Sequence, residues 1–415
     1  MTISRRRFLG LTTAAAALAA GASVHAADKQ AEALSSLTSG AQAISEQEHA
    51  ARIGKLQALM QQRKVAALLV ESGSSLDYFT GIRWRRSERT MAALIRAEGG
   101  TMVVSPFFEE PSIREMLKIK AEVRTWNEDE SPFDLIASAM QGLAAKGPLA
   151  VEETTRYFVV DRVSKVWSAG QIVSGDTLVN ACRMIKSPAE LALMQAANDV
   201  TITALKHVHA RIEAGMGGPD IMKMMVAATE ALGGTHQFSL VLLNEASAYP
   251  HGTEIPQTIR NGSVVLIDTG CTVHGYQSDI SRTWIFGEPT GRQREVWVTV
   301  KRGQEIALET AKIGIPVGMI DKAVRAYYEG RGWSKDYALP GTSHRTGHGI
   351  GMDGHEAPYL MRADMTPLEA GMCFSDEPGI YIPGEFGVRM EDCWHMTESG
   401  PKLFTPLAKS IDDPI

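Results

Sequence analysis

The spacing of apolar residues divides the chain into regions with different patterns. In the first folded region, apolar residues recur at helical spacing from Ile53 to Met60, and the unbroken apolar run at residues 65–70 is typical of a buried strand. Further short strands are expected at residues 91–95, 102–105 and 149–152, and a helix is expected over residues 132–146. This alternation predicts an α/β domain of ordinary size.

A strong helix-start signal marks the boundary to the second region. Ser187 and Glu190 form a capping box around Pro188 at the first helical position, so we expect a long helix from here to about residue 214. From about residue 238 the pattern changes to strands and Gly-rich turns, interrupted by expected helices over residues 292–313 and 320–331. No internal repeat is visible, which excludes solenoids and propellers. We therefore place the first domain at residues 48–183 and the second at residues 184–415.

The N-terminus has a pattern of its own. Arg5, Arg6 and Arg7 precede an Ala-rich, weakly apolar run over residues 9–22, and this stretch resembles a twin-arginine export signal. The run is shorter and more diluted than the roughly 20 apolar residues that span a membrane. We therefore expect residues 1–26 to be a signal peptide, residues 27–47 to be a flexible tail, and the mature protein to be periplasmic or secreted without a membrane span.

Composition and charge exclude several classes of protein. With 44% hydrophobic residues, the chain is not a disordered one. The net charge is −6, and removal of the signal with its three arginines would bring it to −9, so nucleic acid is not an expected partner. Four cysteines without a C-x-x-C pair are too few for a disulfide scaffold, and we expect Cys271 and Cys393 to be reduced, packed thiols.

The second region concentrates acids and histidines on short strands bounded by glycine. Asp268 ends an apolar strand, and Asp279 follows eleven positions later. Buried acids are costly, and two of them on neighbouring strands repel each other unless a cation lies between them. Further along the chain come His348, Glu377 and Glu391. Four carboxylates and one imidazole form an oxygen-dominated ligand set that suits a pair of divalent ions.

The local motifs around these five residues resemble those of a known family. Their contexts are D-T-G, S-D-I-S-R-T, G-H-G-I-G, D-E-P-G and R-M-E-D, and they are similar to the dinuclear metallopeptidases of the creatinase/methionine aminopeptidase family, above all to prolidase and aminopeptidase P. The motifs Y-P-H-G at residues 249–252 and L-D-Y-F-T-G at residues 76–81 support this resemblance. It implies an α+β protein in which a C-terminal pita-bread domain is preceded by a smaller, creatinase-like α/β domain.

The resemblance also implies a role for each site residue. Asp268 would chelate one metal ion, Asp279 and Glu391 would bridge two ions, and His348 and Glu377 would complete the second. Two ions roughly 3.5 Å apart can share a hydroxide that attacks the substrate. Glu377 would also handle the proton of the attacking water, and His251 and His355 would hydrogen-bond the carbonyl oxygen or the oxyanion. His344 is a further catalytic candidate that could instead simply line the pocket. Arg389 would either fix Glu391 or contact a substrate carboxylate.

The expected function is that of an exported, dinuclear, metal-dependent peptidase, acting as a homodimer, that hydrolyses the Xaa-Pro bond of dipeptides or short peptides. Manganese is the favoured metal, with cobalt, iron and zinc as alternatives. A metal-dependent lyase or an amidinohydrolase on a small zwitterion is the alternative reaction, and a binding protein with an inactive site is a third option. The basic segment at residues 83–89 is either a solvated loop or an arm that reaches a neighbouring subunit's cleft.

Overall fold

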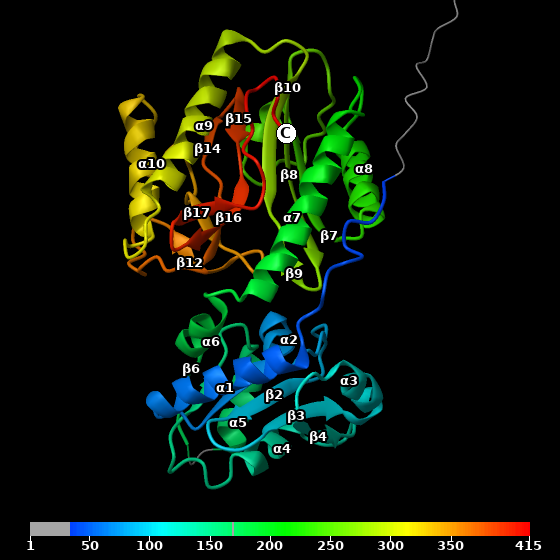
Figure 1. The fold of residues 1–415 in the computed structure, drawn as a ribbon. Coiled ribbons are helices and arrows are strands. Elements are labelled where there is room, and N and C mark those ends of the chain that lie inside the picture. Colours follow the sequence, from blue (N-terminus) through cyan, green and yellow to red (C-terminus); the bar gives the residue numbers. More distant parts are fainter. Residues whose placement is uncertain (1–33, 168–169) are drawn as a thin grey trace, which may run out of the picture. The chain divides into compact units, whose positions relative to one another are not determined.

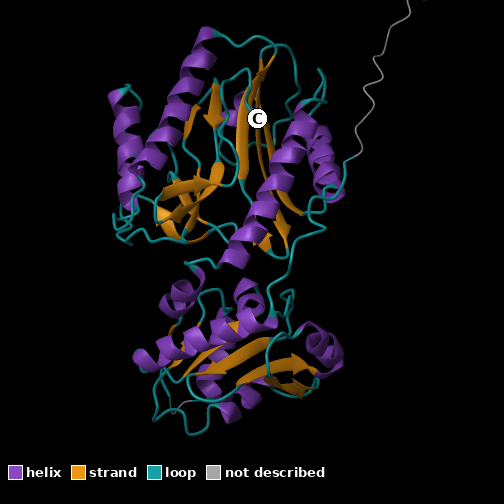
Figure 2. Ribbon diagram, viewed as in Figure 1, coloured by secondary structure: helices purple, strands orange, loops and turns teal. Residues whose placement is uncertain are grey.

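The computed structural model describes residues 34–167 and 170–415. The export signal predicted for residues 1–26, and the first part of the predicted tail, lie outside these residues. The described chain alternates helices and strands first and then changes to longer strands with fewer helices (Figures 1 and 2). This arrangement confirms the predicted α+β class, with a smaller α/β domain before a larger one.

The first domain is built on one mixed sheet of six strands in the order β4-β3-β2-β1-β5-β6. β1 runs antiparallel to β2 and parallel to β5, and apolar side chains from the sheet and from α4 and α5 form one buried core. The strands are β1 (Ala67–Glu71), β2 (Ala92–Arg96), β3 (Thr101–Pro106), β4 (Ala121–Trp126), β5 (Leu149–Val151) and β6 (Ile172–Ser174). The helices are α1 (Glu46–Gln62), α2 (Ser74–Thr80), α3 (Glu110–Met116), α4 (Pro132–Ala139), α5 (Tyr157–Val166) and α6 (Asp176–Arg183), with a 3-10 turn, η1, at Phe107–Glu109.

The second domain holds a four-stranded sheet, a five-stranded sheet and a two-stranded hairpin. The first sheet has the order β10-β8-β7 with β9 paired to β8, and the second has the order β12-β11-β13-β16-β17. The strands are β7 (Thr235–Leu243), β8 (Ser263–Val273), β9 (Tyr276–Gln277), β10 (Ile280–Phe286), β11 (Gly347–Gly349), β12 (Glu356–Leu360), β13 (Cys373–Asp376), β14 (Gly379–Ile382), β15 (Phe386–Arg389), β16 (Asp392–Thr397) and β17 (Gly400–Leu403). The helices are α7 (Pro188–His209), α8 (Gly218–Ala231), α9 (Gly291–Thr310) and α10 (Gly318–Gly330), with a 3-10 turn, η2, at Asn244–Ala248.

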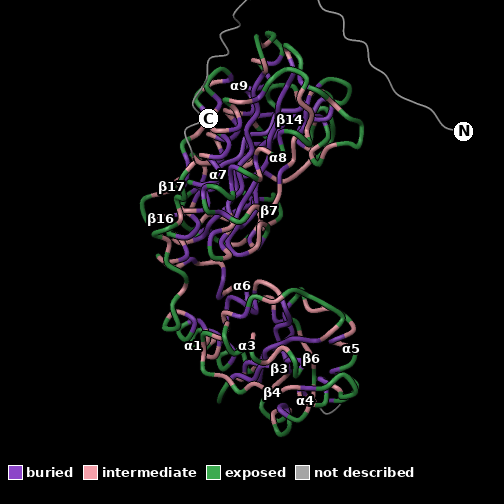
Figure 3. Tube along the Cα trace, turned by 90° about the vertical axis from the view of Figure 1, so that its right-hand side faces the viewer, coloured by how far each residue is buried: buried purple, intermediate pink, exposed green. Residues whose placement is uncertain are grey.

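Four helices cover the strands of the second domain and leave their inner faces to the site. α7 and α8 pack on β8 and β7, while α9 packs against α10 and against strands β13 to β15 (Figure 1). Buried segments run through the interior of this domain and exposed ones follow its loops (Figure 3). A core of aliphatic and aromatic side chains joins α9 and α10 to the strands of the hairpin and of the second sheet. The strands that carry the acids and histidines are therefore backed by packed helices.

Several element ends differ from the prediction. The helix expected to end near residue 214 ends at His209, because the chain turns so that the Gly215 N–H bonds to the Ile259 carbonyl. The helix expected over residues 132–146 ends at Ala139, and the turns after it include Gly142 with φ of 77°. Such a left-handed conformation favours glycine and is incompatible with a continuing α-helix.

The described part of the predicted tail is not loose. Its Leu37 N–H bonds to the Leu232 carbonyl, and the Thr38 hydroxyl donates to the Gly233 carbonyl at 3.0 Å. Helix α1 begins at Glu46, two residues before the expected domain start, because the Ser45 side chain caps it. The prediction missed these contacts because the segment lacks any periodic apolar pattern.

The basic segment at residues 83–89 forms contacts within its own chain. Arg83 pairs with Asp77, Arg86 donates to the Ser72 carbonyl at 2.8 Å, and Arg89 pairs with Glu128. The segment is thus a tethered surface loop in the described chain.

All four cysteines are unpaired and buried, as expected for Cys271 and Cys393. None of the described helices combines the length and apolarity that crossing a membrane requires.

Candidate metal centre

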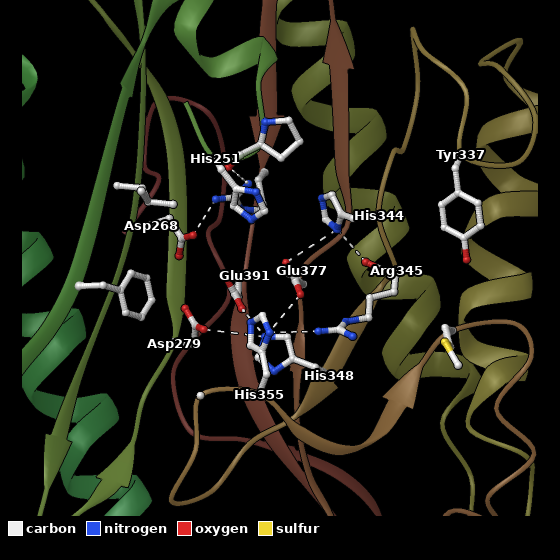
Figure 4. Close-up of a pocket in the computed structure, with 16 residues that line it drawn as sticks. His251, Asp268, Asp279, Tyr337, His344, Arg345, His348, His355, Glu377 and Glu391 are labelled. Atoms are coloured by element: carbon white, nitrogen blue, oxygen red, sulfur yellow. Dashed lines mark hydrogen bonds and ion pairs between the residues drawn. The ribbon is translucent and has the colours of Figure 1, made fainter. Parts of the chain in front are cut away.

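The five predicted ligands come from separate strands and converge on one place (Figure 4). Asp268 lies on β8, Asp279 lies just before β10, and His348 lies on β11. Glu377 follows β13 directly, and Glu391 lies between β15 and β16, where its backbone pairs with Ser281 of β10. The two sheets and the hairpin thus bring together residues that are far apart in the sequence.

The distances between the ligand atoms are those of a shared cation site. His348 Nε2 lies 3.4 Å from Glu377 Oε1, 3.8 Å from Asp279 Oδ2 and 3.9 Å from Glu391 Oε1. The ligand atoms form compact groups of three that could each hold an ion, among them Asp268–Asp279–Glu391 and His348–Glu377–Glu391. Glu391 belongs to both groups, and two adjacent ion positions with a bridging carboxylate agree with this arrangement.

The electrostatics of the site call for bound cations. Asp268 Oδ1, Asp279 Oδ1 and Glu391 Oε1 are buried and have no hydrogen-bond partner. Burial and the neighbouring carboxylates raise the pKa of Asp279 and of Glu391 well above the usual range. Burial also raises the pKa of Glu377 to about 7, against the opposing effect of Arg389. Carboxylate oxygens that repel one another and receive no hydrogen bond are suited to bind a pair of divalent ions.

Arg389 lines the cavity and donates hydrogen bonds to groups around the predicted ligands. Its Nη2 donates to Asp268 Oδ2 at 2.6 Å and its Nε donates to the Ser281 hydroxyl, which in turn donates to Glu391 Oε2 at 2.9 Å. A further donor, Nη1, serves the Tyr381 hydroxyl. Of its two predicted roles, the structure therefore supports fixing the ligands, because these donors are committed to protein acceptors.

His344 and Tyr381 form a hydrogen-bonded pair beside the ligands. His344 Nε2 lies 2.7 Å from the Tyr381 hydroxyl, and its Nδ1 lies 3.9 Å from Glu377 Oε2. Burial, reinforced by Arg389, lowers the pKa of His344 to about 3, so the ring is neutral at physiological pH. His344 and the predicted metal ligands line the same cavity. This histidine therefore lies close to the candidate metal centre.

The other two predicted histidines also line this cavity. The ring of His355 lies beside that of His348, with 3.9 Å between centroids and the two planes tilted by 41°, while the exposed His251 ring lies near Asp268 (Figure 4). His355 directly precedes Glu356, whose carboxylate accepts from Lys186 Nζ and Arg183 Nη2, each at 2.6 Å. This buried ion cluster anchors the backbone at the start of β12 and hence the position of His355. Both histidines are available to a ligand in the cavity.

Sequence reasoning missed part of the site. The cavity, of about 580 Å³, is also lined by Phe238 and Leu240 of β7, by Arg345, and by Tyr337 and Met361. Arg345 stands between His344 and His348 in the S-H-R-T-G-H motif, which was the one available signal for it. The others lie on a strand or loop without a chemical motif, so their contribution depends on the tertiary fold alone.

This fold and site define a two-domain metallohydrolase, and comparison with known proteins agrees. Residues 192–398 match the description "Metallopeptidase family M24", and residues 52–185 match "Creatinase/Prolidase N-terminal domain". The chain belongs to the M24 creatinase/prolidase family, and the predicted creatinase-like and pita-bread domains are confirmed.

Individual relatives cover nearly the whole chain. An uncharacterized peptidase of Schizosaccharomyces pombe is 30% identical over 89% of this chain and 84% of its own length. An Xaa-Pro dipeptidase of Lactobacillus helveticus is 28% identical over 86% of this chain and 98% of its own length. The crystal structure of a prolidase from Thermococcus sibiricus is similar with a TM-score of 0.80 and 27% identity, over 86% of this chain and 97% of that one. The chain is thus an M24 metallohydrolase similar to prolidases.

Proposed function

We propose that the protein is an exopeptidase that hydrolyses the Xaa-Pro bond of dipeptides and short peptides with two divalent metal ions. The observation that carries this proposal is the set of five converging ligands with unpartnered, buried carboxylate oxygens at the wall of an open cavity. The names of the Lactobacillus helveticus and Thermococcus sibiricus relatives support the Xaa-Pro specificity.

The protein side chains divide the work of hydrolysis. Asp268, Asp279, Glu391, His348 and Glu377 would hold the ions, which would supply an activated water and polarise the scissile carbonyl. Glu377, a carboxylate at the wall of the cavity beside the ion positions, would accept a proton from the water and return it to the leaving nitrogen. A donor from His251 or His355 would stabilise the oxyanion by a few kcal/mol.

Arg345 is the group best placed to bind the carboxylate of a dipeptide. Its Nη2 lies 3.1 Å from His355 Nδ1, and its guanidinium lies 4.3 Å from the centre of the Tyr359 ring. No carboxylate of the described residues forms an ion pair with it, although its charge acts on Glu377, and it lines the cavity. A dipeptide with its scissile carbonyl at His355 carries its C-terminal carboxylate only one residue further on, within reach of this arginine.

This assignment predicts that Arg345→Met selectively weakens the hydrolysis of a free dipeptide. The kcat/KM for Ala-Pro should fall on the order of 10- to 100-fold, because a charged hydrogen bond contributes about 1.5–3 kcal/mol, while Ala-Pro amide, which lacks the carboxylate, should be affected much less. Arg331→Met, which replaces an exposed arginine outside the cavity, is the matched control. Equal losses for the two substrates would refute the role of Arg345.

The proposed function has a test of its own. If protein with two bound ions hydrolyses no Xaa-Pro peptide, the peptidase proposal is refuted and the lyase is favoured.

We further propose that residues 1–26 direct export through the twin-arginine route and that folding before export secures the metal. A folded site can be loaded in the cytoplasm with Mn(II), a weak binder that zinc and copper would otherwise displace. Exchange of residues 1–26 for a signal that exports unfolded chains should therefore yield periplasmic enzyme with zinc or copper instead of manganese, measured by elemental analysis. The same metal and the same activity from both routes would contradict the proposal.

A further inference from the structure

The cavity continues past Arg345 to a pair of apolar side chains that the hydrolysis of a dipeptide does not use. Tyr337 lies on the far side of Arg345 from Asp268 and Asp279 (Figure 4). Tyr337 and Met361 both line the cavity and are 42% and 36% exposed. Large apolar side chains exposed at the wall of a ligand cavity are typical of a binding surface, because removing their surface from water lowers the free energy of the complex.

Tyr337 is held in place although it is not part of the core. The guanidinium of Arg325 lies 4.0 Å from the centre of its ring, and that of Arg362 lies 5.2 Å away. Arg325 is itself fixed by the buried Asp321, at 2.9 Å, and donates to the Asp336 carbonyl next to Tyr337. The ring is therefore oriented before any ligand arrives, which lowers the entropic cost of binding to it.

The same contacts join Tyr337 to the catalytic side of the cavity. Arg325 Nη2 also donates to the His344 carbonyl at 2.6 Å, so a single arginine fixes both ends of the loop between them. Met361 lies on the turn after β12, where its N–H bonds to the carbonyl of Tyr359, the residue whose ring Arg345 covers. The Tyr337 ring and the backbone of Met361 are thus each tied to elements that also hold or contact Arg345.

We propose that Tyr337 and Met361 form a binding site for an apolar side chain on the third residue of an Xaa-Pro-Yaa peptide. This inference rests on the proposed function. An extended peptide advances about 3.3–3.6 Å per residue, so a chain that continues beyond the proline passes Arg345 and reaches the two apolar groups. Arg345 then donates to the proline carbonyl instead of a carboxylate. The enzyme is accordingly both a dipeptidase and an aminopeptidase with a preference for apolar third residues.

The test compares kcat/KM for Ala-Pro, Ala-Pro-Gly and Ala-Pro-Phe on the manganese-loaded enzyme. Burial of a phenylalanine side chain contributes about 1.5–3 kcal/mol, so wild type should prefer Ala-Pro-Phe over Ala-Pro-Gly by roughly tenfold or more. Tyr337→Ala and Met361→Ala should each remove most of this preference. Met365→Ala, a methionine nearby in the sequence that is 66% exposed and outside the cavity lining, should keep it.

Two results would overturn the proposal. One is a wild-type enzyme without preference for Ala-Pro-Phe. The other is a loss in Tyr337→Ala and Met361→Ala that is equal for all three peptides, which would mark a general structural effect. If wild type with two bound ions cleaves none of the peptides, the proposed function fails. Calorimetry then still tests the binding site for the third residue. Wild type should bind Ala-Pro-Phe more tightly than Ala-Pro-Gly, and Tyr337→Ala should bind the two peptides equally. A wild type that binds both peptides equally would overturn the proposal.

Discussion

Replacing Asp279 with asparagine is expected to abolish both hydrolysis and the paired binding of metal ions. Asp279 is buried, belongs to the ligand group with Asp268 and Glu391, and lies 3.8 Å from His348. An amide in its place removes one negative charge and one strong oxygen ligand from the centre of the site. Because metal ions contribute several kcal/mol of transition-state stabilisation, kcat should fall about 10³-fold or more.

The measurement is the metal content of the purified variant together with Ala-Pro hydrolysis. The expected result is at most one ion per chain, against two in wild type. Asp353→Asn is the matched control, because Asp353 is a nearby acid that pairs with Arg183 outside the cavity and should keep both ions. An Asp279→Asn variant that retains two ions and normal hydrolysis would rule out the assigned metal centre.

The metal-free protein is expected to lose stability as the pH rises from 6.5 to 8. Burial raises the pKa of Glu377 to about 7, and burial with neighbouring carboxylates raises the pKa of Asp279 and of Glu391 well above the unfolded values near 4. Between the unfolded and the folded pKa, the folded state binds more protons than the unfolded state, so the free energy of unfolding falls with increasing pH.

The histidines of the site act in the opposite direction in this window. Burial lowers the pKa of His344 to about 3 and that of His348 well below its usual range, so these rings bind protons in the unfolded state but not in the folded state. An unfolded histidine is about half protonated at pH 6.5, so each ring adds roughly 0.4 kcal/mol of stability as the pH rises to 8. The comparison of wild type with Glu377→Gln, in which both rings are unchanged, therefore isolates the contribution of the carboxylate.

Thermal melts of the chelated protein at pH 6.5 and pH 8 measure this effect. A carboxylate that titrates in the folded state within this window lowers the free energy of unfolding by at most about 1.4 kcal/mol per pH unit, or on the order of 1–2 kcal/mol from pH 6.5 to 8, which corresponds to a decrease in Tm of about 2–6 °C. Manganese should restore more stability at pH 8, because the ions bind the deprotonated ligands. In Glu377→Gln, which removes one of these ionisable groups, the decrease should be smaller. A Tm that stays constant or rises with pH in the chelated wild type would contradict the prediction.

The convergence of the five predicted ligands could be anticipated from the sequence because each of these residues carries its own local signal. Asp268 ends an apolar strand and His348 lies between glycines, so strand, turn and chemical group are visible within a few residues. The helix starts were predictable for the same reason, since the capping box at Ser187 is a local arrangement and is present in the structure. Local signals of this kind do not require knowledge of distant contacts.

The substrate side of the site could not be predicted in the same way. Arg389 allowed two roles until its distance of 2.6 Å to Asp268 was known, and the two residues are far apart in the sequence. Tyr337 owes its position to Arg325 and Arg362, and the loop between α10 and β11 has no periodic pattern. Residues that act through position alone are therefore found only once the fold is known.

The bridging position of Glu391 also bears on when the site comes into existence during synthesis. Asp268 is translated well before Glu391, yet Glu391 belongs to both ligand groups and its backbone pairs with Ser281. A nascent chain that has formed the first sheet alone exposes two repelling acids and no complete ion position. We therefore expect metal acquisition to be a late event that follows formation of the second sheet, and a ribosome-bound chain stalled before residue 348 should bind manganese no better than an unfolded one.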